Sequence, residues 1–185
     1  MKIDILTLFP EMFTGFLNTS IIKRAIDKGL VTIELHDFRE FSIDKHKHVD
    51  DPYGGGQGMV LMCAPIVECL KTIATDDSFI ILMSPQGITL NHGCAVELSA
   101  KKHLIIVCGH YEGFDERIRD YVDMELSIGD YVLTGGELGS MVVSDAVIRL
   151  LDGAIIWMIL LAMDCLSILS ILAHNAMMVM KCLRY

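Results

Sequence analysis

Residues suited to wrapping a small ligand are densest between positions 127 and 137, where the sequence reads SIGDYVLTGGE. Three glycines and two carboxylates surround a short apolar run there. Because glycine has no Cβ, its backbone N–H and C=O groups can approach a ligand closely. We therefore expect this segment to form one wall of a binding site; an ordinary glycine turn between strands is the alternative. The residues expected to bind are Ser127, Ile128, Gly129, Asp130, Tyr131, Val132, Leu133, Gly135 and Gly136.

Two more turns rich in glycine or proline follow apolar runs that are typical of strands. One is CGHYEGFDER at 108–117, directly after the run 104–107, and the other is MSPQG at 83–87, which closes the run 79–82. Three such junctions are typical of the cofactor crevice at the carboxyl ends of the strands in an α/β sheet. These turns add Gly109, Tyr111, Glu112, Gly113, Ser84, Pro85 and Gln86 to the candidate binding residues.

The segments that must position these turns alternate between strand-like and helix-like patterns. Strands are expected at 2–8, 31–35, 79–83, 104–108 and 125–127. Helices are expected at 12–28, 64–74, 94–101, 115–119 and 140–151, with a polar loop at 39–51. This alternation predicts an α/β fold with a mostly parallel sheet and helices on both faces.

Composition limits the possible classes of function. At 185 residues, a single domain is the default. Six cysteines without a C-x-x-C pair favour reduced thiols in the cytosol over disulfides or a zinc site, and the start MKIDILT lacks the layout of a signal peptide. The net charge of −9 argues against extensive RNA contact, because Lys and Arg neutralise phosphates. The basic run from Lys45 to His48 is the candidate for phosphate contacts, with a solvated loop as the alternative.

Together the three turns resemble those of the bacterial tRNA (guanine-N1)-methyltransferase family, a knotted (SPOUT-class) group that uses S-adenosylmethionine. The resemblance runs from residue 1 to about residue 151. It implies that the three turns form a C-terminal deep trefoil knot around the cofactor. It also implies methyl transfer to N1 of guanosine 37 in tRNA, a requirement for Mg²⁺, and a cytoplasmic homodimer that does not associate with membranes.

The resemblance assigns roles to individual residues. Glu112 would neutralise the sulfonium or help to hold Mg²⁺, and a solvated loop carboxylate is the alternative. Arg149 matches the family's arginine in the helix after the knot, which assists at the guanine or at the carboxylate of the donor. An i, i+4 salt bridge with Asp145 is the alternative for Arg149. The segment GGGQGM at 54–59 resembles the family's glycine loop near the RNA.

The chain beyond residue 151 departs from the family. Residues 154–173 are almost continuous Ile, Leu, Met and Ala, a length that would suit a transmembrane helix. Met and Trp each have only one codon, so the peptide encoded in the neighbouring reading frame can be partly deduced. That frame permits Asp-Asp-Ser-Phe-Ser, followed by residues similar to the family's own continuation. We therefore interpret 152–185 as a frameshift product that replaces the linker and the C-terminal tRNA-binding domain. The family's catalytic aspartate would lie in the codon straddling Met158 and Ile159, so this base is absent here.

The sequence thus predicts a tRNA (guanine-N1)-methyltransferase whose knotted cofactor domain spans residues 1–151. Without its base, the chain is expected to be inactive. Two alternatives stay open: a cofactor-binding or dimerising module without catalysis, and a membrane-anchored protein that uses the apolar tail.

Overall fold

The structure, a computed structural model, describes residues 1–52 and 58–155. Residues Met1–Ala154 form one compact unit. Most of the glycine loop expected near RNA, up to Gln57, and the apolar tail from residue 156 onward lie outside the described residues. Within the described ranges, no helix is both long and apolar enough to cross a membrane.

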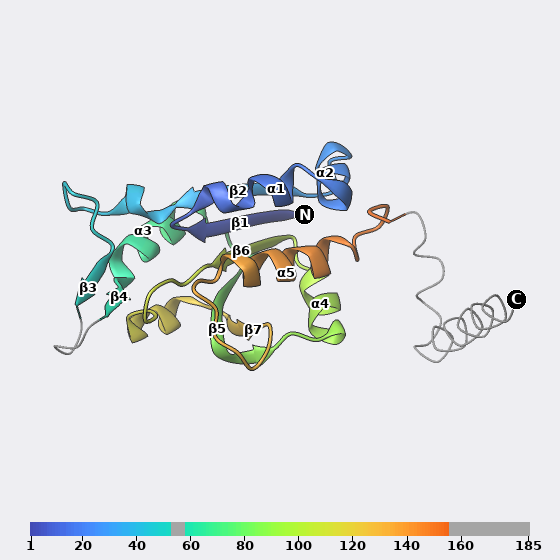
Figure 1. Cartoon of the computed structure of the whole chain (residues 1–185). Helices are drawn as coiled ribbons and strands as arrows, with labels where there is room; N and C mark the ends of the chain where they lie inside the picture. The colour runs from blue at the N-terminus through green and yellow to red at the C-terminus, as the bar shows by residue number, and fades with distance from the viewer. Residues whose placement is uncertain (53–57, 156–185) are drawn as a thin grey trace, which may run out of the picture. The chain divides into compact units, whose positions relative to one another are not determined.

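A parallel sheet of five strands forms the centre of this unit (Figure 1). Its strand order is β2-β1-β6-β5-β7, and each of the four pairings is parallel. The α/β fold with a parallel sheet is therefore confirmed. The strands are β1 (Lys2–Thr7), β2 (Thr32–Asp37), β5 (Ser78–Thr89), β6 (His103–Val107) and β7 (Met124–Ser127).

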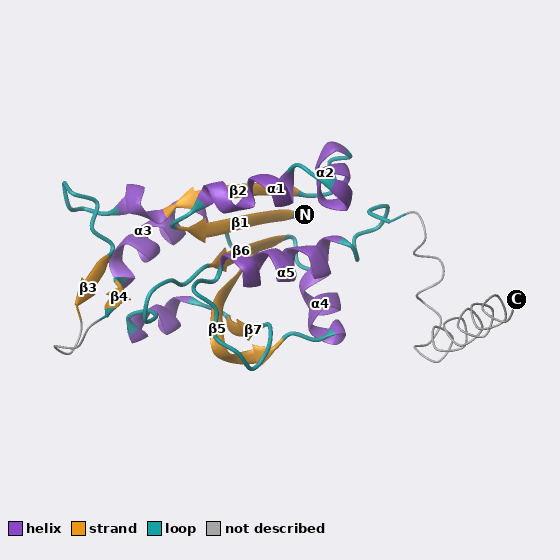
Figure 2. Cartoon of the chain, in the orientation of Figure 1, coloured by secondary structure: helices purple, strands orange, loops and turns teal. Residues whose placement is uncertain are grey.

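Helices connect these strands (Figure 2). The α-helices are α1 (Thr14–Leu17), α2 (Ser20–Asp27), α3 (Cys63–Ile73), α4 (His92–Ser99) and α5 (Glu137–Ile148). The 3-10 helices are η1 (Pro10–Phe13), η2 (Phe38–Phe41) and η3 (Glu116–Tyr121). A separate antiparallel ribbon pairs β3 (Asp50–Pro52) with β4 (Met59–Leu61).

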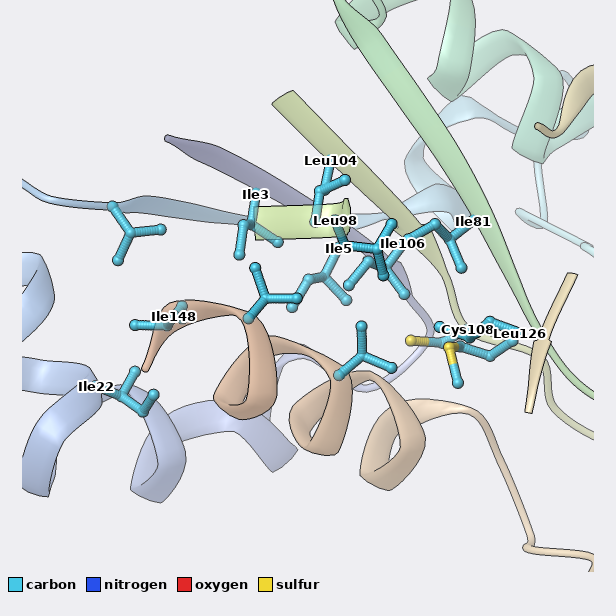
Figure 3. Packing of buried hydrophobic residues seen from close by; sticks show 14 of the residues in the cluster. Ile3, Ile5, Ile22, Ile81, Leu98, Leu104, Ile106, Cys108, Leu126 and Ile148 are labelled. Atoms are coloured by element: carbon cyan, nitrogen blue, oxygen red, sulfur yellow. The ribbon is translucent and has the colours of Figure 1, made fainter. Parts of the chain in front are cut away.

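The sheet has a hydrophobic cluster on each face, because side chains alternate between faces along a strand. Ile3 and Ile5 of β1 belong to the cluster that includes residues of α2, α4 and α5, which Figure 3 shows from close by. Leu6 of β1, with Ile105 and Val107 of β6, belongs to the cluster that includes residues of α3 and η3. Full burial of an Ile or Leu side chain contributes roughly 1.5–3 kcal/mol. The two clusters therefore hold the carboxyl ends of the strands in a defined arrangement.

The predicted helix at 12–28 is wrong as a single element. The chain forms η1 and α1, breaks, and then forms α2. The side chains of Asn18 and Thr19 donate to the carbonyls of Thr14 and Gly15, at 2.8 and 2.7 Å, and Ser20 has a positive φ of 54°. Side chains that take up backbone carbonyls in this way compete with helix continuation.

The predicted polar loop at 39–51 also proved partly wrong, because it includes most of η2 and the start of β3. Strand β3 forms by pairing with β4, which follows it only after an intervening segment. The shortness of both strands left no periodic signal in the sequence. The predicted helix at 115–119 is instead the 3-10 helix η3.

Strand β5 is longer than predicted and carries an irregularity within it. Both Met83 and Ile88 pair with Leu126 of β7, so residues 84–87 are left out of the ladder between them. A Cβ on Gly87 would lie 2.5 Å from the backbone of Glu125 and Leu126. The Ser-Pro-Gln-Gly turn expected after β5 is therefore a bulge inside it, and it faces the ends of β6 and β7.

One carboxylate is fully buried in the middle of the sheet. Asp4 accepts hydrogen bonds from His36 Nε2 at 2.8 Å, from His103 Nε2 at 2.5 Å and from Lys2 Nζ at 2.9 Å. Burial alone would raise the pKa of Asp4, but the hydrogen bonds from His36, Lys2 and His103 outweigh it and lower the pKa to about 2. Asp4 therefore stays ionised at neutral pH.

Candidate functional site

The three sequence-predicted loops, which are the bulge inside β5 and the segments after β6 and β7, meet around a cavity of about 270 Å³. This volume is near the lower end of the ~300–1,000 Å³ usual for ligand sites. All candidate binding residues named from the sequence line it except Asp130. They are Ser84, Pro85, Gln86, Gly109, Tyr111, Glu112, Gly113, Ser127, Ile128, Gly129, Tyr131, Val132, Leu133, Gly135 and Gly136.

The loop after β6 is held in place by the β3–β4 ribbon. Leu61 donates its N–H to Gly113 O at 2.9 Å and accepts from Asp115 N at 2.9 Å, and Glu112 N donates to Met59 O at 3.1 Å. Tyr111 has a φ of 59°, a backbone conformation that is uncommon for a residue other than glycine. The ribbon thus fixes the backbone on both sides of the Glu112 side chain.

The loop before α5 packs directly against the loop after β6. Gly136 N donates to Gly109 O at 2.8 Å, and His110 and Gly135 form an isolated antiparallel bridge. A Cβ on Gly136 would lie 2.8 Å from Cys108 Cα and from Gly109 N. Glycine is required at position 136 because backbone, which cannot swing aside, occupies that space.

A tight turn shapes the third wall of the cavity. Ser127 Oγ accepts from Gly129 N at 3.2 Å and donates to Gly129 O at 2.9 Å. A Cβ on Gly129 would collide with the ring of Tyr131. The half-exposed Tyr131 ring is therefore folded back over Gly129 at the cavity.

A charged network on the cavity lining was missed by sequence reasoning. The Arg119 guanidinium contacts Glu116 at 2.7 Å, Glu125 at 2.9 Å and Gln86 at 3.3 Å. Its partners come from η3, β7 and the β5 bulge, and all four residues line the cavity. Glu116 and Arg119 are only three residues apart, but no local pattern connects them to Gln86 and Glu125, so only the fold could reveal the whole network.

Glu112 lines the cavity and packs closely against Gly58, where a Cβ would lie 2.6 Å from Glu112 Cγ. Glu112 does not belong to a group of three potential metal ligands within the described residues. The one such group found there is Asp4, Glu34 and His36 in the β1–β2 half of the sheet. In that group, Lys2 Nζ already pairs with Asp4 at 2.9 Å and with Glu34 at 3.0 Å.

The structure does not place two of the predicted site residues at the cavity. Asp130 is exposed and does not line it, although its neighbours on both sides do. Arg149 directly follows α5, is exposed and does not line the cavity. Its N–H donates to Asp145 O at 3.1 Å, but no ion pair joins the two side chains, both of which the structure describes.

Two of the four residues in the predicted basic run have an acidic partner close by. Lys47 Nζ pairs with Glu40 at 2.5 Å, and His48 Nδ1 lies 2.6 Å from Asp44. The ion pair of Lys47 with Glu40 reduces the positive potential available to phosphates. The run is therefore a weaker candidate for RNA contact than the sequence suggested.

The chain is similar in sequence to a family of known proteins. The family model described as tRNA (guanine-1)-methyltransferase, TrmD, matches residues 1–158. A tRNA (guanine-N(1)-)-methyltransferase of Carboxydothermus hydrogenoformans is 56% identical over 157 residues, which cover 84% of this chain and 62% of the relative. Its counterpart in Ureaplasma urealyticum is 59% identical over 157 residues, which cover 84% of this chain and 69% of that relative. The aligned part of the chain thus spans roughly two thirds of the length of these relatives.

Proposed function

The chain belongs to the tRNA (guanine-1)-methyltransferase family. We therefore propose that its cavity binds S-adenosylmethionine and that the protein methylates N1 of a guanosine in tRNA. The resemblance to the family indicates guanosine 37 as the target. The observation that carries this proposal is the convergence of the three glycine-bearing loops, predicted from sequence, on one cavity. The relatives bear the name of this activity.

The cavity fits the donor in shape and chemistry. Gly109, Gly135 and Gly136 present backbone where any Cβ would clash, and those of their N–H and C=O groups that are not engaged in the hydrogen bond from Gly136 N to Gly109 O can read an adenine edge. Met83 and Ile128 supply apolar surface for the ring, and Glu112 supplies a negative charge for the sulfonium. When bound, the cofactor supplies an activated methyl group. The loops contribute by fixing its position, since methyl transfer depends on the alignment of donor and acceptor.

Guanine N1 carries a proton that a base must remove. The family's aspartate base would be encoded across Met158 and Ile159, which lie outside the described residues. We propose that residues 152–185 result from a frameshift after a cofactor domain at 1–151. This polypeptide would then bind the donor without transferring methyl groups, which is the binding-module alternative. Arg149 would act at the guanine or at the donor's carboxylate only if a further element brings the substrate to it.

Mg²⁺ is proposed as a further requirement, with Glu112 as the residue of this chain that would hold it. A single carboxylate is enough for an ion that usually keeps several waters and uses substrate oxygens. With tRNA and donor both in the cytoplasm, we infer a cytoplasmic enzyme.

A deep trefoil knot and a homodimer complete the proposal. The close backbone packing between the loop after β6 and the loop before α5 is consistent with threading of one past the other. Exposed apolar side chains on α5 support a dimer: Leu138 is 50% exposed, and Val142, one turn further along the helix, is 46% exposed. Contiguous exposed apolar surface commonly marks a protein interface. Light scattering of the chain and of Leu138→Glu would test the dimer.

Isothermal titration with S-adenosylhomocysteine tests the proposed cofactor site directly. We expect one saturable site in the chain, and no measurable methylation of tRNA. A version with the other reading frame restored after about residue 151 should bind the ligand and also methylate tRNA. Absence of binding in both versions would overturn the proposal; robust methylation by the present chain would overturn the frameshift.

A further inference from the structure

Two polar groups beside the cavity have hydrogen-bonding capacity that the described residues do not use. The carboxylate of Glu137, which is 2% exposed, accepts from Thr7 Oγ1 at 2.8 Å through Oε1. No described residue donates to its other oxygen, Oε2. Nδ1 of His110 is buried and also makes no hydrogen bond with any described residue. A buried polar group without a partner costs about 1–3 kcal/mol, so a native fold rarely leaves an imidazole nitrogen such as His110 Nδ1 unpaired beside a carboxylate oxygen that is free to accept.

Glu137 Oε2 and His110 Nδ1 both lie next to the position that a side chain at Gly135 would occupy. A Cβ built on Gly135 would contact Glu137 Oε2 and would lie 2.7 Å from His110 Nδ1. The backbone bridge between His110 and Gly135 holds the two chain segments together. Glycine at 135 therefore leaves open the space through which the imidazole and the carboxylate can meet.

The His110 ring has little freedom to turn Nδ1 elsewhere. It is tilted against Phe9, with ring centroids 4.8 Å apart, and makes an edge contact with Tyr111, also at 4.8 Å. Glu137 is equally constrained, because it is the first residue of α5 and Thr7 holds one of its oxygens. A negative charge at this end of a helix is favoured by the helix dipole.

We propose that His110 Nδ1–H donates to Glu137 Oε2, directly or through one buried water, and that the chain Thr7–Glu137–His110 positions the loop after β6 for the cofactor. Its effect on binding rests on the proposed function. In the neutral ring this hydrogen bond requires the Nδ1–H tautomer, which leaves Nε2 as an acceptor. The three residues belong to β1, the loop after β6 and α5, so they join the ends of three distant segments.

Thr7 and Glu137 do not line the cavity and act through His110, which does line it, so these two are positioning residues. His110 lies between Gly109, which accepts the hydrogen bond from Gly136, and Tyr111, which lines the wall. Loss of the hydrogen bond would release the ring and, with it, the backbone that holds these two neighbours.

The tautomer of His110 can be read by ¹⁵N NMR on histidine-labelled protein, with His110→Phe used to assign the signal. We expect the Nδ1–H pattern in the unaltered chain and a change of that pattern in Glu137→Gln, which keeps the size of the side chain. Thr7→Val, which removes only the supporting hydroxyl, should shift the ¹⁵N pattern of His110 in the same direction. Lys102→Met, which alters an exposed ion pair with Asp77, serves as the matched control.

Affinity for S-adenosylhomocysteine should fall about tenfold in Glu137→Gln and in His110→Phe, and the double variant should be little weaker than either. An Nε2–H pattern in the unaltered chain, or one that Glu137→Gln and Thr7→Val both leave unchanged, would overturn the inference. If the unaltered chain fails to bind the ligand, the proposed function fails, whereas the tautomer measurement still decides the hydrogen bond.

Discussion

Replacing Gly136 by alanine would test whether two backbone segments must touch to form the cavity. The new Cβ would lie 2.8 Å from Cys108 Cα, whereas ordinary contacts begin near 3.4 Å. The loop before α5 would therefore have to move by about 0.6 Å in an interior that is close-packed. Such overpacking costs about 1–3 kcal/mol. Losing the 2.8 Å hydrogen bond from Gly136 N to Gly109 O adds about 1 kcal/mol.

We therefore expect Gly136→Ala to lower the free energy of unfolding by about 2–4 kcal/mol. We also expect its affinity for S-adenosylhomocysteine to fall at least tenfold, because a wall of the cavity is displaced. Urea denaturation and calorimetric titration would measure the two effects. Gly15→Ala is the matched control, since nothing lies within 4 Å of its Cβ and it is exposed in α1. If both variants unfold at the same midpoint and bind alike, close backbone contact does not shape this site.

Three other predictions concern groups described above. The folded-state pKa of Asp4, about 2, lies below its ordinary value of 3.8, so its ionisation stabilises the fold fully above about pH 4. About 2 kcal/mol of stability should be lost as pH falls from 4 to 2; pH-dependent denaturation should show this component in the parent and not in Asp4→Asn. Arg119→Met should weaken the binding of S-adenosylhomocysteine several-fold by releasing Gln86 and Glu125, whereas Lys71→Met, whose partner Glu68 does not line the cavity, should not; equal affinities in the two variants would contradict the network's role. Burial raises the pKa of Cys69 to about 12, so peptide mapping after alkylation should find Cys94 modified well before Cys69; the reverse order would be inconsistent with the fold.

The parallel sheet could be predicted because its strands are apolar runs bounded by glycine, proline or polar residues. The stretch from Leu104 to Val107, for example, is buried at every position and reads as a strand without any knowledge of its neighbours. The ribbon of β3 and β4 could not be predicted, since each strand is defined by its partner rather than by its own pattern. The knot and the frameshift stay predictions.

The cavity was largely foreseen because glycine marks close backbone approach, as at Gly109 and Gly136. The sequence did not separate Asp130 from its neighbours, since its exposure depends on how the turn after Ser127 closes. Arg119 and Glu137 were missed for a different reason. Their partners are brought near by β-sheet topology, and neither residue sits in a local pattern that distinguishes it from a solvated charge.

The hydrogen bonds of Leu61 make the β3–β4 ribbon and the loop after β6 a single mechanical unit. One residue of β4 serves both Gly113 and Asp115, so neither element can shift without breaking the other's backbone pairing. Any ligand that orders one of them thereby lowers the entropic cost of ordering the other. By thermodynamic reciprocity, if a ligand beside the ribbon changes the affinity of the cavity by some factor, a ligand in the cavity changes the affinity beside the ribbon by the same factor.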